Sequence, residues 1–331
     1  MIGWAALTAR IAPACGDRPS PVPMRPRLRP HLGFLLAIAA ATGSPSAADR
    51  LDPDSHRNAA PVQLSRALDG SLSRDERAEE LAWLVATAEG GDGTALHILG
   101  ALYRLGRHHP ARLLEQDDFK AERYLTDAAR LGHLHAMAGL AELGLAQRNA
   151  RNAMSWALLH AHYTKVKWQM PTTAQRPRPA RNHAYAASLM LRSHRLLADD
   201  ETLRAQVNAD AAAFVSRYDA PVRAGMAVAG TLIDGSAAGP SQLPPSAAYA
   251  TSRHSPREPA VAIFLIGVDP RGRTDRYVVV DSLPDAQVAR ALRRQVKRLQ
   301  FRADPSAEPL RWTFTPFEYD TRTMGLVGDP P

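Results

Sequence analysis

Histidine is the residue type with the clearest chemical potential in this chain, because six of its 12 histidines form three close pairs. The pairs are His108 with His109, His133 with His135, and His160 with His162. Neutral imidazole is a common zinc ligand, but residues two positions apart on a helix point about 200° away from each other. Only His133 and His135, in a predicted turn, could ligate a metal together. They define one alternative hypothesis, a metal-dependent enzyme or enzyme accessory.

Motifs for other catalytic centres are absent from the sequence. It contains no Gly-x-Ser-x-Gly elbow, no His-Glu-x-x-His and no phosphate-binding loop. Gly91 and Gly93 begin a dinucleotide-binding pattern, but Leu96 stands where the third glycine is required, and no strand precedes them. We therefore predict that the protein is not an enzyme, and we assign no catalytic residue, cofactor or metal. In this interpretation the paired histidines are surface or half-buried side chains.

The N-terminal segment has the layout of a secretory signal peptide. Arg25, Arg27 and Arg29 form a positive region, residues 32–41 are apolar, and Ser46-Ala47-Ala48 is a small-residue cleavage site. The apolar run is too short to span a bilayer stably. We expect residues 1–48 to be a signal peptide (Met24 to Ala48) with an upstream extension, and the mature protein to be periplasmic. An uncleaved anchor is the alternative, and membrane association is expected only in that case.

Charge and cysteine content exclude several functions. Residues 1–48 hold five of the 41 Lys and Arg residues and one of the 33 Asp and Glu residues, so the remainder has a net charge of +4. That balance is ordinary for a protein surface and does not indicate nucleic-acid binding. The only cysteine, Cys15, lies in the predicted leader, so the mature chain has no disulfide, thiol nucleophile or thiolate metal site.

A repeat of 41 residues organises the first half of the chain. Four residues recur at this distance: Ala88, Gly91, Ala95 and Leu99 match Ala129, Gly132, Ala136 and Leu140. A fixed period of this length is typical of stacked helix pairs, each of which buries its apolar face against a neighbour. Helices are expected over 74–89, 94–105 and 134–145, with Ser73 and Glu76 as a capping box. Another helix is expected to end at Arg130, with either Asp117 or Asp118 as its cap.

These units resemble Sel-one-like repeats, a tetratricopeptide-related family. The matching residues are Ala95, Leu99, Gly100, Tyr103 and Gly106, followed by Ala121, Tyr124, Ala128, Ala129 and Gly132. The resemblance covers residues 75–163 and implies a helical-repeat solenoid that binds a protein or peptide. We assign residues 63–220 to this domain, with helices over 184–197 and 201–218 as a cap. Residues 49–62 and 165–181 are expected to be loops, and residues 221–258 to be a flexible linker.

The C-terminal residues 259–320 follow a β-β-α-β pattern. Residues 261–268 form an apolar strand, Asp269-Pro270-Arg271-Gly272 a turn, residues 276–282 a second strand, and residues 310–317 a third. A helix is expected over 285–301, because Val288, Leu292, Val296 and Leu299 share one face. The predicted fold class is thus multidomain, with a helical solenoid, a linker and a small α+β domain.

This module resembles the C-terminal domain of TonB-type energy transducers. The matching residues are Asp269, Gly272, Val278 to Val280, Ser282, Leu292, Val296, Phe301, Pro305, Trp312, Pro316 and Phe317. The Tyr-Pro segment and the long Pro/Lys-rich spacer of that family are absent. The resemblance therefore implies a docking module, and energy transduction with a retained N-terminal anchor is a second alternative.

Two groups of residues in this module are candidates for partner binding. The final strand could accept a peptide by strand addition through Arg311, Trp312, Thr313, Phe314 and Thr315, with Trp312 and Phe314 holding the strand on the helix. Arg290, Arg294 and Lys297 belong to a basic helix face, which is either a solvated surface or a site for an acidic protein or anionic lipid headgroups. We predict a non-enzymatic periplasmic scaffold that binds protein or peptide partners, one on the helical repeats and one through a mobile C-terminal module.

Overall fold

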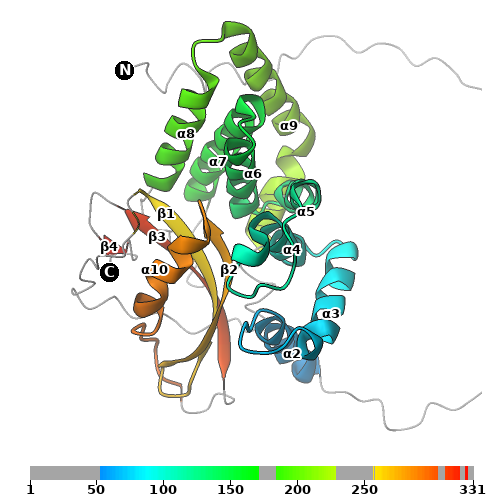
Figure 1. Ribbon diagram of the computed structural model, residues 1–331, viewed down its shortest axis with the longest axis vertical. Coiled ribbons are helices and arrows are strands. Elements are labelled where there is room, and N and C mark those ends of the chain that lie inside the picture. Colours follow the sequence, from blue (N-terminus) through cyan, green and yellow to red (C-terminus); the bar gives the residue numbers. More distant parts are fainter. Residues whose placement is uncertain are drawn as a thin grey trace, which may run out of the picture. The chain divides into compact units, whose positions relative to one another are not determined.

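The computed structural model describes residues 53–170, 184–228, 256, 258–304, 310–320 and 325–326. A helical region is followed along the chain by a small C-terminal sheet region (Figure 1). The predicted signal peptide and Cys15 lie outside the described residues. No helix in the described ranges has both the length and the apolar character needed to cross a membrane.

The helical region contains helices α2 to α9. Their bounds are α2 Pro53–Ala67, α3 Ala78–Glu89, α4 Gly93–Leu105, α5 Asp118–Arg130, α6 Leu134–Ala146, α7 Ala150–Gln169, α8 Ala184–Leu197 and α9 Glu201–Val228. Short 3₁₀ turns precede α3 (Asp75–Arg77) and follow α4 (Gly106–His108). Each helix from α2 to α7 packs against the next one, and α9 returns to contact α5 and α7.

The helix starts follow the local sequence. The predicted capping box is confirmed, because Glu76 Oε2 accepts from the Ser73 backbone N–H at 2.7 Å and Ser73 Oγ accepts from the Glu76 N–H. The side chains of Asp92, Asp117 and Asn149 cap α4, α5 and α7. Short polar side chains thus satisfy the first free N–H groups of these helices.

The 41-residue period has a structural counterpart. Gly91 and Gly132 follow α3 and α5 at equivalent turns, with φ of +90° and +87°. These are left-handed conformations that glycine adopts without a steric penalty. The matched pair Leu99 and Leu140 is buried in the same core. Gly100 permits close helix contact, because a Cβ there would lie 2.6 Å from Leu125 Cγ.

Three helices extend into segments predicted to be irregular. Helix α2 occupies most of residues 49–62, α7 continues to Gln169, and α9 continues through Pro221 to Val228, so the linker prediction is wrong for residues 221–228. Val222 and Met226 are buried in the helical core. Apolar burial therefore outweighs the hydrogen bond that Pro221 cannot make. Residues 229–255 lie outside the described part of the chain.

The sheet region confirms the predicted β-β-α-β order. It consists of β1 Ala260–Val268, β2 Thr274–Leu283, α10 Ala286–Val296, β3 Arg311–Asp320 and β4 Gly325–Leu326. The strands are antiparallel in the order β2-β1-β3-β4. The predicted turn is present, since the Gly272 N–H donates to the Asp269 carbonyl and Gly272 has φ +80°.

Helix α10 ends at Val296, five residues before the predicted end. Leu299 and Phe301 are still buried in the core beneath the helix. The chain reaches this core by a different path, because Gln300 bridges to Arg273 and the Phe301 N–H donates to the Gly272 carbonyl at 2.7 Å. The apolar spacing therefore predicted the burial correctly but not the backbone.

The two faces of the sheet are covered by different helices. Alternate β1 residues, including Phe264 and Ile266, pack with α10. The others, including Ile263 and Leu265, belong to the same core as the helical region, which contacts the sheet through α4, α6 and α8. All nine β1 residues are buried, which explains the continuous apolar run. The two regions thus share a packed interface, in contrast to the expected independently mobile module.

Candidate functional site

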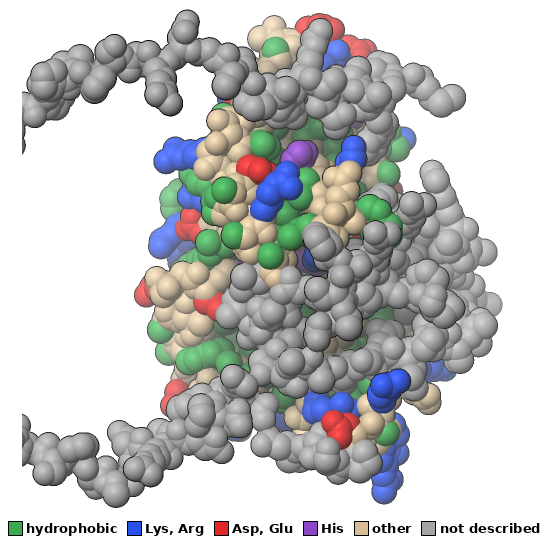
Figure 2. Space-filling view, turned by 180° about the vertical axis from the view of Figure 1, so that it is seen from behind, with side chains coloured by type: hydrophobic (Ala, Val, Ile, Leu, Met, Phe, Trp, Pro, Cys, Tyr) green, Lys and Arg blue, Asp and Glu red, His purple; other side chains and the backbone are tan. Residues whose placement is uncertain are grey.

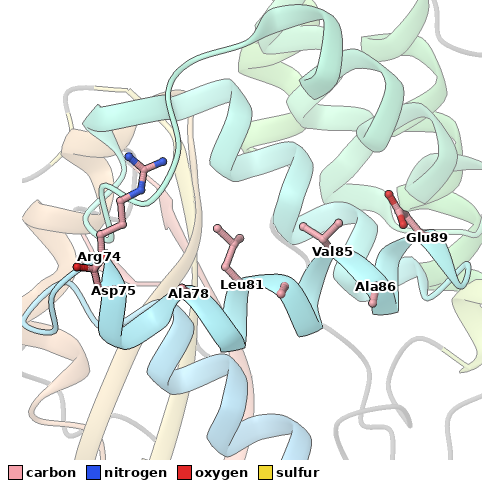
Figure 3. Close-up of a pocket in the computed structure, with 8 residues that line it drawn as sticks. Arg74, Asp75, Ala78, Leu81, Val85, Ala86 and Glu89 are labelled. Atoms are coloured by element: carbon pink, nitrogen blue, oxygen red, sulfur yellow. The ribbon is translucent and has the colours of Figure 1, made fainter.

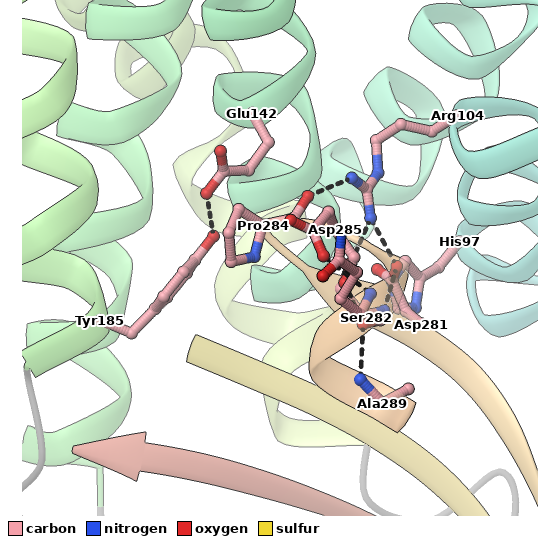
Figure 4. Close-up of polar contacts among 10 residues, drawn as sticks. His97, Arg104, Glu142, Tyr185, Asp281, Ser282, Pro284, Asp285 and Ala289 are labelled. Carbon is pink, nitrogen blue, oxygen red and sulfur yellow. Dashed lines mark hydrogen bonds and ion pairs between the residues drawn. The ribbon is translucent and has the colours of Figure 1, made fainter. Parts of the chain in front are cut away.

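A buried polar centre joins the sheet to the helical region. Asp281 lies near the end of β2, opposite Ile263, on the face that packs against helices. Its side chain is fully buried and contacts His97 and Arg104, which both belong to α4 (Figure 4). A buried carboxylate must be paired or hydrogen bonded to be tolerated, and these two residues supply the partners.

Three N–H groups donate to the Asp281 carboxylate. Arg104 Nη2 donates to Oδ1 at 2.8 Å, the Ser282 N–H donates to Oδ1 at 2.7 Å, and His97 Nε2 donates to Oδ2 at 2.9 Å. Arg104 also donates to the carbonyls of Ser282 and Pro284. Burial opposes ionisation of Asp281, but Arg104 and His97 outweigh it and hold the pKa of this carboxyl well below its usual value.

This centre contains the residue types of a hydrolytic triad, Ser, His and Asp, but not the hydrogen bonds that join them in such a triad. The Ser282 hydroxyl donates to the Asp285 carbonyl and accepts from the Ala289 N–H (Figure 4). It is thus committed to the start of α10 and not to His97. A nucleophile needs a hydrogen bond to its base. The observed contacts therefore serve to fix α4, β2 and α10 against one another.

A second buried group holds α8 against α6. Glu142 accepts from Tyr185 Oη at 2.7 Å and from both terminal nitrogens of Arg192, at 2.9 and 2.5 Å. Burial and the neighbouring Glu142 raise the pKa of Tyr185 well above its usual value. The phenol therefore stays protonated and acts as a donor. Neither this group nor the Asp281 centre was identified from the sequence.

The structure brings three histidines together between α4 and α6. The His97 ring lies 6.1 Å from the His133 ring and 6.3 Å from the His135 ring, centre to centre. His97 Nε2 contacts Asp281, and His133 Nε2 lies so close to Gly93 that a Cβ built on that glycine would be 2.6 Å from it. Burial lowers the pKa of His133 to about 3. The described residues include no group of three or more His, Cys, Asp or Glu arranged to hold a metal.

The outer edge of β3 carries the first predicted binding group. The backbone N–H of Ser282 donates to the Asp281 side chain, and its carbonyl accepts from Arg104, so both groups point away from β1. Ala262, which lies opposite Ser282 on β1, therefore points its backbone groups toward β3, where it lies opposite Phe317. Odd-numbered β3 residues therefore bond to β1, and even-numbered ones point their backbone groups outward. Among the described residues only Tyr319 and Asp320 pair with β4, which leaves the outward groups of Trp312 and Phe314 unpaired.

The side chains of this strand are arranged differently from the prediction. Trp312 and Phe314 do share one face, but they pack in the core of the helical region and not against α10. The indole of Trp312 lies over Gly267, which has no side chain to obstruct it. Phe317 and Tyr319 pack with α10 instead. Thr315 is buried and Thr313 half-buried, while Arg311 donates to the Arg302 carbonyl at 2.8 Å.

The second predicted binding group, the basic residues Arg290, Arg294 and Lys297, is exposed to solvent. Arg290 and Arg294 are exposed on α10, together with Arg293, and Lys297 and Arg298 are exposed in the turn that follows the helix. Seen from behind, the described surface mixes hydrophobic side chains with charged side chains of both signs (Figure 2). The five exposed basic side chains are therefore placed by the burial pattern along α10 and the turn after it.

An apolar groove runs along the outer face of α3. It has a volume of about 530 Å³, and Leu81 and Val85 project from the same side of the helix (Figure 3). The other lining residues are Arg74, Asp75, Ala78, Ala82, Ala86 and Glu89. The spacing of three and four places them on one helix face. The amphipathic pattern of residues 74–89 already indicated an apolar helix face. A sequence pattern does not distinguish an apolar face that is open to a partner from one that is buried in the core.

No family model, curated protein or solved structure matches this chain. Its function must therefore be inferred from its own residues and their geometry.

Proposed function

We propose that this protein is a non-enzymatic scaffold that binds an extended segment of a partner protein along the outer edge of β3. The supporting observation is the row of outward backbone groups at Trp312 and Phe314, which no described strand pairs. Unpaired strand edges bind extended peptides through main-chain hydrogen bonds. Pro316 limits the open edge, because it has no N–H to offer.

The helical region supplies the second binding surface in this proposal. If residues 75–163 are Sel-one-like repeats, α3 is the first helix of these repeats, and its groove takes an apolar segment of a second partner. Leu81 and Val85 are half-buried at the centre of this groove. The buried contacts of Asp281 hold both surfaces in one unit. The scaffold thus presents two partners at a fixed separation, in the periplasm if the N-terminal segment directs export.

The strand-edge site predicts a specific effect of proline at residue 314. A peptide selected on the full chain from a random display library is expected to bind Phe314→Pro at least tenfold more weakly than the wild type. Proline removes the outward N–H and clashes with the incoming strand. Phe314→Val is the matched control, because it also loses the ring but keeps the N–H. Its affinity, measured by fluorescence anisotropy, should stay within about threefold of the wild type.

Equal binding by Phe314→Pro and Phe314→Val would refute strand addition. Circular dichroism of both variants establishes that each remains folded. Arg290→Glu on α10 should leave peptide affinity unchanged, since it lies on the other face of the sheet. Loss of peptide binding in Arg290→Glu would place the peptide on the basic helix instead.

The groove on α3 predicts a separate loss of partner contact. A photoreactive residue introduced at the exposed Ala82 is expected to crosslink a partner in cells, and Leu81→Arg should reduce this adduct at least tenfold. A buried unpaired charge strongly opposes docking of an apolar segment. Leu191→Arg is the matched control, because Leu191 is a 52% exposed leucine on α8. Adducts that persist unchanged in Leu81→Arg would remove the groove from the proposal.

A further inference from the structure

The exposed face of α10 and the turn after it carry five basic side chains. They are Arg290, Arg293 and Arg294 on the helix and Lys297 and Arg298 in the turn. At 100° per residue the three helix residues span an arc of about 100°. The buried side chains Val288, Leu292 and Val296 lie on the opposite side of the helix, against the sheet. The helix therefore turns Arg290, Arg293 and Arg294 toward solvent, and Lys297 and Arg298 are exposed in the turn that follows.

These cations differ from several exposed arginines elsewhere in the protein. Arg107, Arg151, Arg223 and Arg273 each form an ion pair with a nearby carboxylate. Within the described ranges no carboxylate lies at ion-pair distance from any of the five cations of α10 and the turn after it. Within the same ranges, the only hydrogen bond made by these five side chains is from Arg293 Nε to Tyr277 Oη, at 3.3 Å. The positive charge of this face is consequently not neutralised by those residues.

The position of α10 makes this face accessible to a large, flat ligand. α10 packs on β1 and β2, whereas the helical region packs on the other face of the sheet. None of the exposed large hydrophobic residues of the described chain lies on α10. Binding energy in protein interfaces comes mostly from buried aromatic and other anchor residues. The composition of this face therefore favours a ligand recognised by charge alone.

We propose that the basic face of α10 docks the protein onto an anionic lipid surface. Each Lys or Arg close to such a surface strengthens binding about fivefold through electrostatic attraction alone. A bilayer presents many negative headgroups in one plane, which matches a row of cations without apolar anchors. The proposal is independent of peptide binding at β3, because the two surfaces use different residues.

The test is sedimentation of the full chain with vesicles of phosphatidylcholine containing 0, 20 or 40% phosphatidylglycerol. The bound fraction should rise with the phosphatidylglycerol content and fall when salt is raised to 0.5 M. The triple variant Arg290→Glu, Arg294→Glu, Lys297→Glu should lower the partition coefficient at least 100-fold on the anionic vesicles. The bound fraction on pure phosphatidylcholine is the uncharged baseline and is subtracted.

The matched control is Arg123→Glu, Arg195→Glu, Arg217→Glu, which makes the same change in net charge at exposed positions of the helical region. It should retain most of the binding. Equal losses in the two triple variants would show a dependence on net charge and overturn the proposal. Displacement of the protein from vesicles by poly-glutamate or duplex DNA, at charge concentrations equal to that of the lipid, would also overturn it, in favour of an acidic protein or nucleic acid.

Discussion

Asp281→Asn is expected to lower the free energy of unfolding by about 3 to 5 kcal/mol, because it leaves Arg104 buried without a counter-charge. Arg104 is 8% exposed and Asp281 is not exposed at all. The neutral amide keeps the size of the side chain but cannot accept from Arg104, His97 and the Ser282 N–H as a carboxylate does. Urea denaturation followed by circular dichroism measures the change.

The matched control for this substitution is Glu115→Gln, which breaks the exposed ion pair between Arg107 and Glu115. Solvent screens such a pair, so little change in stability is expected. A double variant that replaces both Arg104 and Asp281 by leucine should recover much of the loss, since no buried charge remains. If Asp281→Asn were as mild as Glu115→Gln, the polar centre would not be what joins the two regions.

The same centre shows why part of the fold was predictable. Local patterns gave the secondary structure: helix periodicity placed α4, α5 and α6 within a residue or so, and the apolar run at residues 261–268 identified β1. The contact between α4 and β2 joins residues separated by 177 positions. No local pattern encodes that pairing. Only the presence of His97 and Arg104 within an otherwise apolar helix indicated that polar partners were required.

The candidate sites were likewise predictable where local periodicity determines them, but not where they depend on contacts between distant parts of the chain. The exposed bases of α10 followed directly from helix periodicity, since the apolar positions fixed the buried side. The edge strand was also predicted, but Trp312 and Phe314 were assigned to the face covered by α10, which is the wrong face. The alternation of side chains shows which β3 residues share a face, but it does not show which helices cover that face. Trp312 and Phe314 pack with the helical region. The His133 and His135 rings likewise approach a third histidine, His97, that the repeat pattern gave no reason to include.

Acidification is expected to destabilise the protein through His109, a fully buried residue beside the Asp281 centre. Burial lowers the pKa of His109 to about 4. The nearby charge of Asp281 raises this pKa and the charge of Arg104 lowers it further, but burial is the largest effect. The unfolded chain takes up a proton near pH 6.5, whereas the folded protein does so only near pH 4. The stability contributed by the neutral imidazole is therefore complete above pH 6.5. It should fall by about 2 kcal/mol between pH 6.5 and 4.5.

His109→Asn isolates this effect, because asparagine does not titrate and its oxygen can accept from the Ala111 N–H as His109 Nδ1 does. Other groups also contribute to the pH dependence. Burial raises the pKa of Glu318 to about 7, which acts in the opposite direction between pH 4.5 and 7, and the lowered pKa of Asp281 acts only below pH 4. The difference between wild type and variant cancels both terms. Urea unfolding at pH 6.5, 5.5 and 4.5 should therefore show a shallower decline for His109→Asn. Parallel declines would mean that His109 binds its proton alike in the folded and unfolded chain, and would contradict the prediction.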